Sequence, residues 1–233
     1  MAVEDQSAGY ASVTILERQA LGGGSWYFDW GGQYEDYAFG NRGSFPINRL
    51  QDVAANFGLE YYLKSEQVAS LTVSPGLYFQ NHPGEAGGDA PVQLVSGVPI
   101  VGPLSGVVGA MDGRLYHEPL PIFGLVWIIS PDVRLEAVYP NPSLIVTCGK
   151  DLEAKLIGEL VGGAFATDPS PQRTRVEYYG YRVGGSIAYQ LGRGFELDGG
   201  SGVELERVFD FYQESRRINA ASAPYLELSI VYR

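Results

Sequence analysis

The sequence contains very little cysteine and histidine. Cys148 is the single cysteine among 233 residues, so an internal disulfide is excluded. Only His82 and His117 could act as an imidazole base, and neither lies in a recognisable nucleophile motif. Two separated histidines and one cysteine also lack the spacing of a metal site. We therefore expect no enzyme activity, with an outer-membrane hydrolase as the alternative, and no bound metal or cofactor.

Long apolar runs and an excess of positive charge are also missing. The best apolar run, from Leu120 to Ile129, is about half of the roughly 20 residues that a membrane helix requires. The net charge of -11 disfavours a nucleic-acid partner. The first six residues lack the charged and apolar regions of a secretory signal. These absences exclude a helical membrane protein and a nucleic-acid-binding protein.

What the sequence does contain is glycine, tyrosine and a two-residue period. It has 31 Gly, 16 Tyr and 14 Pro, which is typical of many strands joined by turns. Between residues 179 and 191 the odd positions are mostly apolar, namely Tyr179, Tyr181, Val183, Gly185, Ile187, Tyr189 and Leu191. The even positions are small or polar, namely Gly180, Arg182, Gly184, Ser186, Ala188 and Gln190. Segments 195–206 and 226–233 alternate in the same way, which indicates half-buried antiparallel strands.

Alternation alone does not show which face of the sheet contacts water. We therefore use the residue types on the polar face to distinguish a soluble barrel from a membrane barrel. Only Lys64, Lys150 and Lys155 are lysines, whereas a solvated sheet surface normally carries many. Arginine dominates instead and suits a confined space beside carboxylates. Tyr179 and Tyr189 are about 34 Å apart along a strand, or about 26 Å in height at a tilt of roughly 40°. The pattern favours a membrane barrel that is apolar outside, and a soluble lipid-binding barrel remains the alternative.

The fold class that we predict is all-β, an antiparallel up-and-down transmembrane β-barrel of about 12 strands, with 10 or 14 possible. A short N-terminal periplasmic segment, 1–9, precedes a single barrel domain, 10–233. Strands are expected at 10–20, 25–39, 50–64, 68–80, 92–112, 115–129, 132–140, 143–149, 151–167, 173–192, 194–213 and 223–233. An even count places both termini on the periplasmic side. The two prolines in 98–103 suggest a bend or a turn, so an error of one strand is expected within 92–130.

The final segment, Tyr225 to Arg233, resembles the closing strand that the barrel-assembly machinery recognises in bacterial outer-membrane proteins. More narrowly, the last half of the chain is similar to a family of outer-membrane barrels known as a domain of unknown function. The motifs that carry this resemblance are Pro121-x-x-Gly124-x-x-Trp127, Tyr139-Pro140-x-Pro142, Gly158-Glu159-Leu160-x-Gly162-Gly163, Tyr178-x-x-Tyr181-Arg182-Val183-Gly184 and Glu204-x-Glu206-x-Val208-Phe209. The resemblance implies a barrel in the outer membrane, with its signal peptide removed, but supplies no activity.

Two sets of residues are candidates for the function. A polar network in the barrel lumen is predicted from Arg134, Glu136, Glu153, Lys155, Glu159, Arg182, Glu196, Asp198, Glu204, Glu206 and Glu227. Aromatic anchors at the membrane interface are predicted from Trp26, Trp30, Trp127, Tyr179, Tyr189 and Tyr232. The network predicts either a structural plug or a narrow pore for small solutes. A barrel that anchors partner proteins of an envelope complex is a further alternative.

Overall fold

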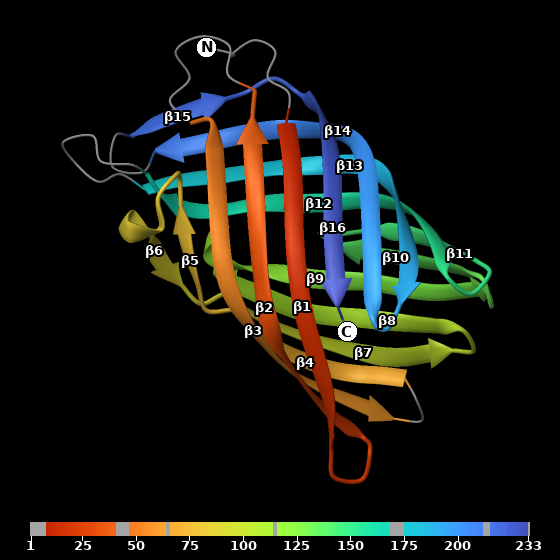
Figure 1. Cartoon of the computed structure of the whole chain (residues 1–233). Helices are drawn as coiled ribbons and strands as arrows, with labels where there is room; N and C mark the ends of the chain where they lie inside the picture. The colour runs from red at the N-terminus through yellow and green to blue at the C-terminus, as the bar shows by residue number, and fades with distance from the viewer. Residues whose placement is uncertain are drawn as a thin grey trace.

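The computed structural model describes residues 8–40, 47–63, 66–113, 116–167, 175–211 and 215–232. It is all-β, and thirteen of its strands form one closed barrel (Figure 1). Residues 1–7 of the predicted segment 1–9 lie outside the described residues. The elements are β1 (Ala8–Leu21), β2 (Trp26–Phe39), β3 (Arg49–Leu63), β4 (Glu66–Val73), β5 (Gly76–Phe79), η1 (Pro83–Glu85), β6 (Gly87–Asp89), β7 (Val92–Val101), β8 (Leu104–Gly113), β9 (Tyr116–Ser130), β10 (Val133–Tyr139), β11 (Ser143–Cys148), β12 (Leu152–Ala166), β13 (Arg175–Gly192), β14 (Phe195–Phe211), β15 (Arg216–Asn219) and β16 (Ala223–Tyr232). Within these ranges no helix is long and apolar enough to cross a membrane.

The predicted barrel is confirmed, and its strand count is close to the predicted twelve. The additional strand lies in the region 92–130. The expected single strand 92–112 is a hairpin, β7 and β8, that turns at Gly102 and Pro103. Gly102 has a φ of 52°, which is accessible to glycine at little cost, and proline has no N–H to donate to a ladder.

The odd count changes how the barrel closes. Neighbours along the wall are antiparallel except for β1 and β16, which are parallel with Ala8 opposite Tyr225 and Ile15 opposite Tyr232. The start of β1 and the end of β16 therefore lie toward opposite ends of the barrel. The expectation that both termini share one end is wrong for this reason.

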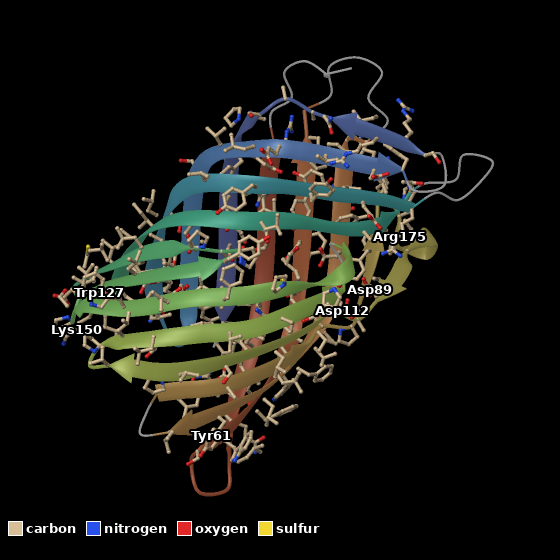
Figure 2. All side chains as sticks on the ribbon, turned by 180° about the vertical axis from the view of Figure 1, so that it is seen from behind. Tyr61, Asp89, Asp112, Trp127, Lys150 and Arg175 are labelled. Atoms are coloured by element: carbon tan, nitrogen blue, oxygen red, sulfur yellow. The ribbon has the colours of Figure 1, made fainter. Side chains whose placement is uncertain are left out.

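The connections give the two ends of the barrel different characters. Residues 22–25, 102–103, 131–132, 149–151 and 193–194 form tight turns at one end, which we call the short-turn end. The opposite, long-loop end carries the segment 74–91, with β5, η1 and β6, and the segment with β15. Figure 2 shows Trp127 and the turn residue Lys150 on the side of the short-turn end, and Asp112, Asp89 and Arg175 toward the long-loop end.

Strand β13 shows how the wall is oriented along most of its height. Val183, Ile187 and Leu191 are exposed, at 44%, 55% and 58%. On the opposite face Arg182 and Ala188 are buried, at 1% and 3%. The aliphatic row therefore lies on the exterior of the barrel and the polar row on its interior. Leu226 and Leu228 on β16, and Val13 and Ile15 on β1, are exposed in the same way.

Toward the long-loop end the two faces exchange their residue types, so that the interior becomes apolar and the exterior polar. Val176 and Tyr178 lie on the same face of β13 as Arg182, yet they are apolar and fully buried. They belong to an aromatic core inside the barrel, formed by Tyr37, Phe39, Ile47, Leu50, Tyr78, Val161, Phe165, Val176, Tyr178, Phe209, Phe211, Ile218 and Ala220. The exterior of the same end is polar, with Arg49 Nη2 at 2.5 Å from Asp36 Oδ2. This end of the barrel is built like a soluble barrel, apolar inside and polar outside.

Strand β5 gives the aromatic core its enclosure. It pairs with β3 along Gly76–Phe79 and reaches β12 at Ala166, opposite Phe79. A smaller ring of eight strands is thereby closed at the long-loop end, running β3, β2, β1, β16, β14, β13, β12 and β5. Inside this ring Tyr178 and Phe209, a directly opposite pair of β13 and β14, pack with ring centroids 4.8 Å apart. Figure 1 shows β5 and β6 beside the upper part of β3.

Candidate functional site: the interior of the barrel

A cavity lies inside the barrel, in the half nearer the short-turn end. It has a volume of about 570 Å³, and we call it the acidic cavity. The strands β10, β12, β14 and β16 direct polar side chains into it because these residues share the inward parity of their strands. Eight residues of the predicted network line it, namely Arg134, Glu136, Glu153, Lys155, Glu159, Glu196, Asp198 and Glu227.

Ion pairs and an acidic excess define the electrostatics of this cavity. Lys155 Nζ lies 3.3 Å from Asp198 Oδ2 and 3.4 Å from Glu153 Oε1. Arg134 Nε lies 2.9 Å from Glu136 Oε1. Of the described residues that line the cavity, seven are Asp or Glu and three are Lys or Arg. A hollow with this balance attracts cations and repels anions.

Above the acidic cavity, Arg182 and Glu204 form a fully buried ion pair. Their side chains are 1% and 0% exposed, and Arg182 Nε lies 3.4 Å from Glu204 Oε2. The guanidinium of Arg182 also lies 4.6 Å from the ring centre of Tyr10 and 5.1 Å from that of Tyr225. A planar cation held between aromatic faces is attracted by their quadrupoles when water is excluded. The pair forms the floor of the aromatic core.

Two glycines of β13 leave the room that this buried pair needs. A Cβ on Gly180 would lie 2.6 Å from Glu204 Oε1, and a Cβ on Gly184 would lie 2.3 Å from the Tyr225 hydroxyl. Neither contact is sterically possible without a shift of the neighbour. The glycines on the polar face of the predicted alternation therefore accommodate the large side chains of β14 and β16.

Glu206 lies apart from the rest of the predicted network. At this point Glu206 and Arg207 of β14 oppose Gly180 of β13, which forms a β-bulge, and Glu206 has a φ of 50°. Glu206 is exposed, whereas Arg207 is fully buried and donates from Nε to Ala221 O at 2.9 Å. The bulge also moves the odd positions of β14 from the exterior to the interior, where Phe209 and Phe211 join the aromatic core.

The six predicted anchor aromatics are exterior residues. Five lie toward the short-turn ends of their strands, namely Trp26, Trp30, Trp127, Tyr189 and Tyr232, with exposures between 39% and 48%. Tyr179 lies toward the other end of β13, where Arg217 Nη2 donates to its hydroxyl at 2.6 Å. Trp26 packs against Tyr61, and Tyr232 against Phe195, with centroids 4.7 and 4.8 Å apart.

Sequence reasoning missed a second group of interior charges near the short-turn end. Arg18 Nε lies 2.9 Å from Asp29 Oδ1, and Arg18 Nη2 lies 2.5 Å from Glu60 Oε2. The three residues belong to β1, β2 and β3, and the register places Arg18 directly opposite Asp29. Alternation was a signal for Asp29 and Glu60, because each lies between apolar or aromatic neighbours in its strand, but not for Arg18, whose neighbours Glu17 and Gln19 are polar.

Two smaller cavities extend the hollow interior. A cavity of about 230 Å³, the upper cavity, shares Glu159 with the acidic cavity and continues toward Asp112 and Gly113. Another of about 430 Å³ shares Arg134 and Glu136 with the acidic cavity and lies along β7, β8 and β9. Glu159 therefore stands where the interior narrows between the two ends of the barrel.

In the part of the chain that the structure describes, no group of three or more His, Cys, Asp or Glu residues is arranged to hold a metal ion. A comparison with models of known protein families finds no match, and neither does a comparison with curated proteins. The function must therefore be argued from the barrel itself.

Replacing Glu204 tests whether the buried pair stabilises the fold. We expect Glu204→Gln to lower the free energy of unfolding by about 3–5 kcal/mol, because Arg182 and Arg207 would keep buried charge without their carboxylate. The control Glu206→Gln removes the exposed carboxylate two residues away and should change it by no more than about 0.5 kcal/mol. Urea titration in detergent micelles, followed by tryptophan fluorescence, measures both. Equal losses in the two variants would contradict the assignment.

Proposed function

We propose that the protein is an outer-membrane β-barrel that serves as a structural or narrow-pore envelope protein. The observation that carries this proposal is the exposed aliphatic surface of the barrel wall. Leu226, Leu156 and Ile187 are 70%, 59% and 55% exposed, and each faces outward from a strand whose other face is polar. Hydrocarbon is the solvent that suits such a surface.

The soluble lipid-binding barrel fits the same residues poorly. Such a barrel would bury its aliphatic rows around an apolar cavity and expose its charges. Here Arg182 and Glu204 are buried, and the acidic cavity is lined by ion pairs. An exposed apolar surface that continues around many strands also exceeds what soluble monomers carry.

The inverted long-loop end supports an orientation in the membrane. Its polar exterior, with the pair Arg49–Asp36 and the bond from Arg217 to Tyr179, suits water rather than lipid. We therefore place this end outside the cell and the tight turns on the periplasmic side, in agreement with the usual distribution of short turns and long loops. The resemblance of Tyr225–Arg233 to a closing strand supports assembly by the barrel-assembly machinery.

The aromatic core restricts what can pass along the barrel axis. It fills the eight-stranded ring at the long-loop end, whereas the acidic cavity fills the half nearer the short turns. A wide axial channel is therefore blocked. The remaining connection runs from the acidic cavity past Glu159 into the upper cavity, so we assign to the barrel at most a narrow route that prefers cations.

An arginine on the aliphatic row distinguishes membrane from water. At Val183, which is 44% exposed and lies about midway between Tyr179 and Tyr189, we expect Val183→Arg to cost about 2–4 kcal/mol, because a guanidinium near the bilayer centre loses its hydration. Gln19→Arg, at an exposed position near the short-turn end of β1, is the control and should cost less than about 1 kcal/mol. Unfolding titrations in phosphatidylcholine vesicles measure both. If Val183→Arg is as stable as the control, the row does not face lipid.

Conductance tests the blocked axis. In a planar bilayer we expect no steps of the size that an open porin gives, because the aromatic core fills the eight-stranded ring. Any residual current should prefer potassium over chloride, and Glu159→Gln should weaken that preference, as measured by the reversal potential in a salt gradient. Large ohmic steps in the wild-type protein would refute the plugged barrel, and an anion preference would refute the role given to the acidic cavity.

A further inference from the structure

The barrel wall is incomplete on one side, above the hairpin of β10 and β11. β9 pairs with β10 only as far as Phe123, and β12 pairs with β11 only from Leu152 to Ile157. Beyond these points, the described residues 120–122 of β9 and 158–165 of β12 have a β-ladder partner on one side only. The two unpaired edges face each other across a lateral opening in the half of the wall nearer the long-loop end.

Prolines account for this opening. Pro140 and Pro142 end the ladder of the β10–β11 hairpin, because neither has an N–H to extend it. Pro119 and Pro121 occupy the unpaired part of β9, where a missing donor costs least. The loop between the prolines caps the edge of β12, since Leu160 N donates to Asn141 Oδ1 at 3.0 Å and Gly158 N to Pro142 O at 2.8 Å.

Both edges of the opening line the upper cavity. Leu120 contributes from β9, and residues 159–162 contribute from β12. Apolar residues on this side include Met111, Leu160 and Val161. Deeper inside, the cavity reaches Tyr10, Gln33 and Glu35 on β1 and β2. Its lining is therefore apolar at the wall and polar toward the centre of the barrel.

The exterior around the opening is apolar. Phe123 is 55% exposed and stacks on Tyr139, with ring centroids 5.4 Å apart, and the two residues are the last pair of β9 and β10. Leu156 is 59% exposed on the β12 side. Unpaired backbone is tolerated at membrane depth only where it is buried in protein or lines a hydrated cavity, and the edge of β12 meets this condition.

The charge of the cavity restricts the ligand. Glu35, Asp112 and Glu159 line it, and among the described lining residues none is Lys or Arg. A volume of about 230 Å³ is below that of pockets that enclose a whole drug-sized ligand. It suits a small headgroup with the first carbons of a chain, while the rest of the chain stays outside. A cationic group would be favoured, and an anionic one repelled.

We propose that the opening between β9 and β12 is a lateral portal that binds a single-chain amphiphile with a cationic headgroup. The headgroup lies beside Glu159 and Glu35 in the upper cavity, and the chain leaves past Leu120 and Leu160 toward the hydrocarbon. The upper cavity shares Glu159 with the acidic cavity, so a bound headgroup also reaches the interior that opens toward the short turns. This inference rests on the proposed membrane location.

Photolabelling in vesicles tests the portal. The probe is dodecyltrimethylammonium that carries a diazirine on its chain, added to the full chain in phosphatidylcholine proteoliposomes. After irradiation and digestion, mass spectrometry maps the adducts. We expect adducts at Leu120, Met111 and Leu160 that unlabelled dodecyltrimethylammonium removes. A fatty acid that carries a diazirine should give no saturable adducts, that is, no adducts that excess unlabelled fatty acid prevents.

Variants assign the headgroup site. Glu159→Gln should lower the saturable labelling about tenfold, the loss of one charge-assisted contact. Glu153→Gln is the matched control, because Glu153 lies on the same inner face of β12 but lines the acidic cavity and not the upper cavity. Saturable labelling of this variant should stay within about twofold of the wild-type level. Leu120→Trp should abolish labelling by filling the cavity. Heat-modifiable migration on a gel verifies that each variant is folded.

The outcomes separate this inference from the proposed function. Adducts confined to the exterior residues Phe123, Leu125 and Leu156, without competition and equal in all variants, would show simple partition into the bilayer and overturn the portal. Saturable labelling by the fatty acid would overturn the charge preference. A chain that fails to float with the vesicles would instead refute the membrane location.

Discussion

The structure depends on one geometrical constraint, the alternation of side chains along each strand. Parity alone assigns every wall residue to the exterior or the interior, so a single strand must satisfy two solvents along its whole length. In β13 the exterior row is aliphatic and the interior row holds Arg182, Ser186 and Ala188. A strand can exchange these two environments in two ways. The residue types of its exterior and interior rows can be swapped, as they are near Tyr178 of β13, or an extra residue can shift the parity, as the bulge of β14 does.

Two zones follow from these inversions. Toward the short turns the interior is charged, and ion pairs such as Lys155–Asp198 offset part of its acidic excess. Toward the long loops the interior is aromatic, and β5 closes a smaller ring around it. The buried pair Arg182–Glu204 lies at the boundary, with glycines on β13 giving it room. The barrel is hollow where its inward-facing residues are charged and plugged where they are aromatic, so the position of this change along the strands sets the boundary between the two halves.

The sequence was sufficient to predict the all-β barrel, since the alternation of 179–191 needs no tertiary information. It was insufficient for the closure, because one glycine–proline turn at 102–103 changes the parity of the strand count and thereby the direction of β16 relative to β1. Ten residues of the predicted interior network lie on the inner face, where parity alone places them. Glu206 does not, because a bulge depends on backbone dihedrals that the pattern of residue types does not reveal. The aromatic core was missed although Val176, Tyr178, Phe209 and Phe211 interrupt the alternation at the strand ends.

The most direct test of the two-zone account is a nitroxide scan of residues 176–191 in a Cys148→Ser background, in vesicles, with oxygen and a nickel chelate as relaxants. The account predicts that odd positions from 181 to 191 collide preferentially with oxygen, which dissolves in hydrocarbon, and that their even neighbours are shielded from it. At Glu177 the preference should change to the water-soluble nickel chelate, while 176 and 178 stay inaccessible to both. Nickel access at the odd positions throughout, or oxygen access at the even ones, would contradict the account.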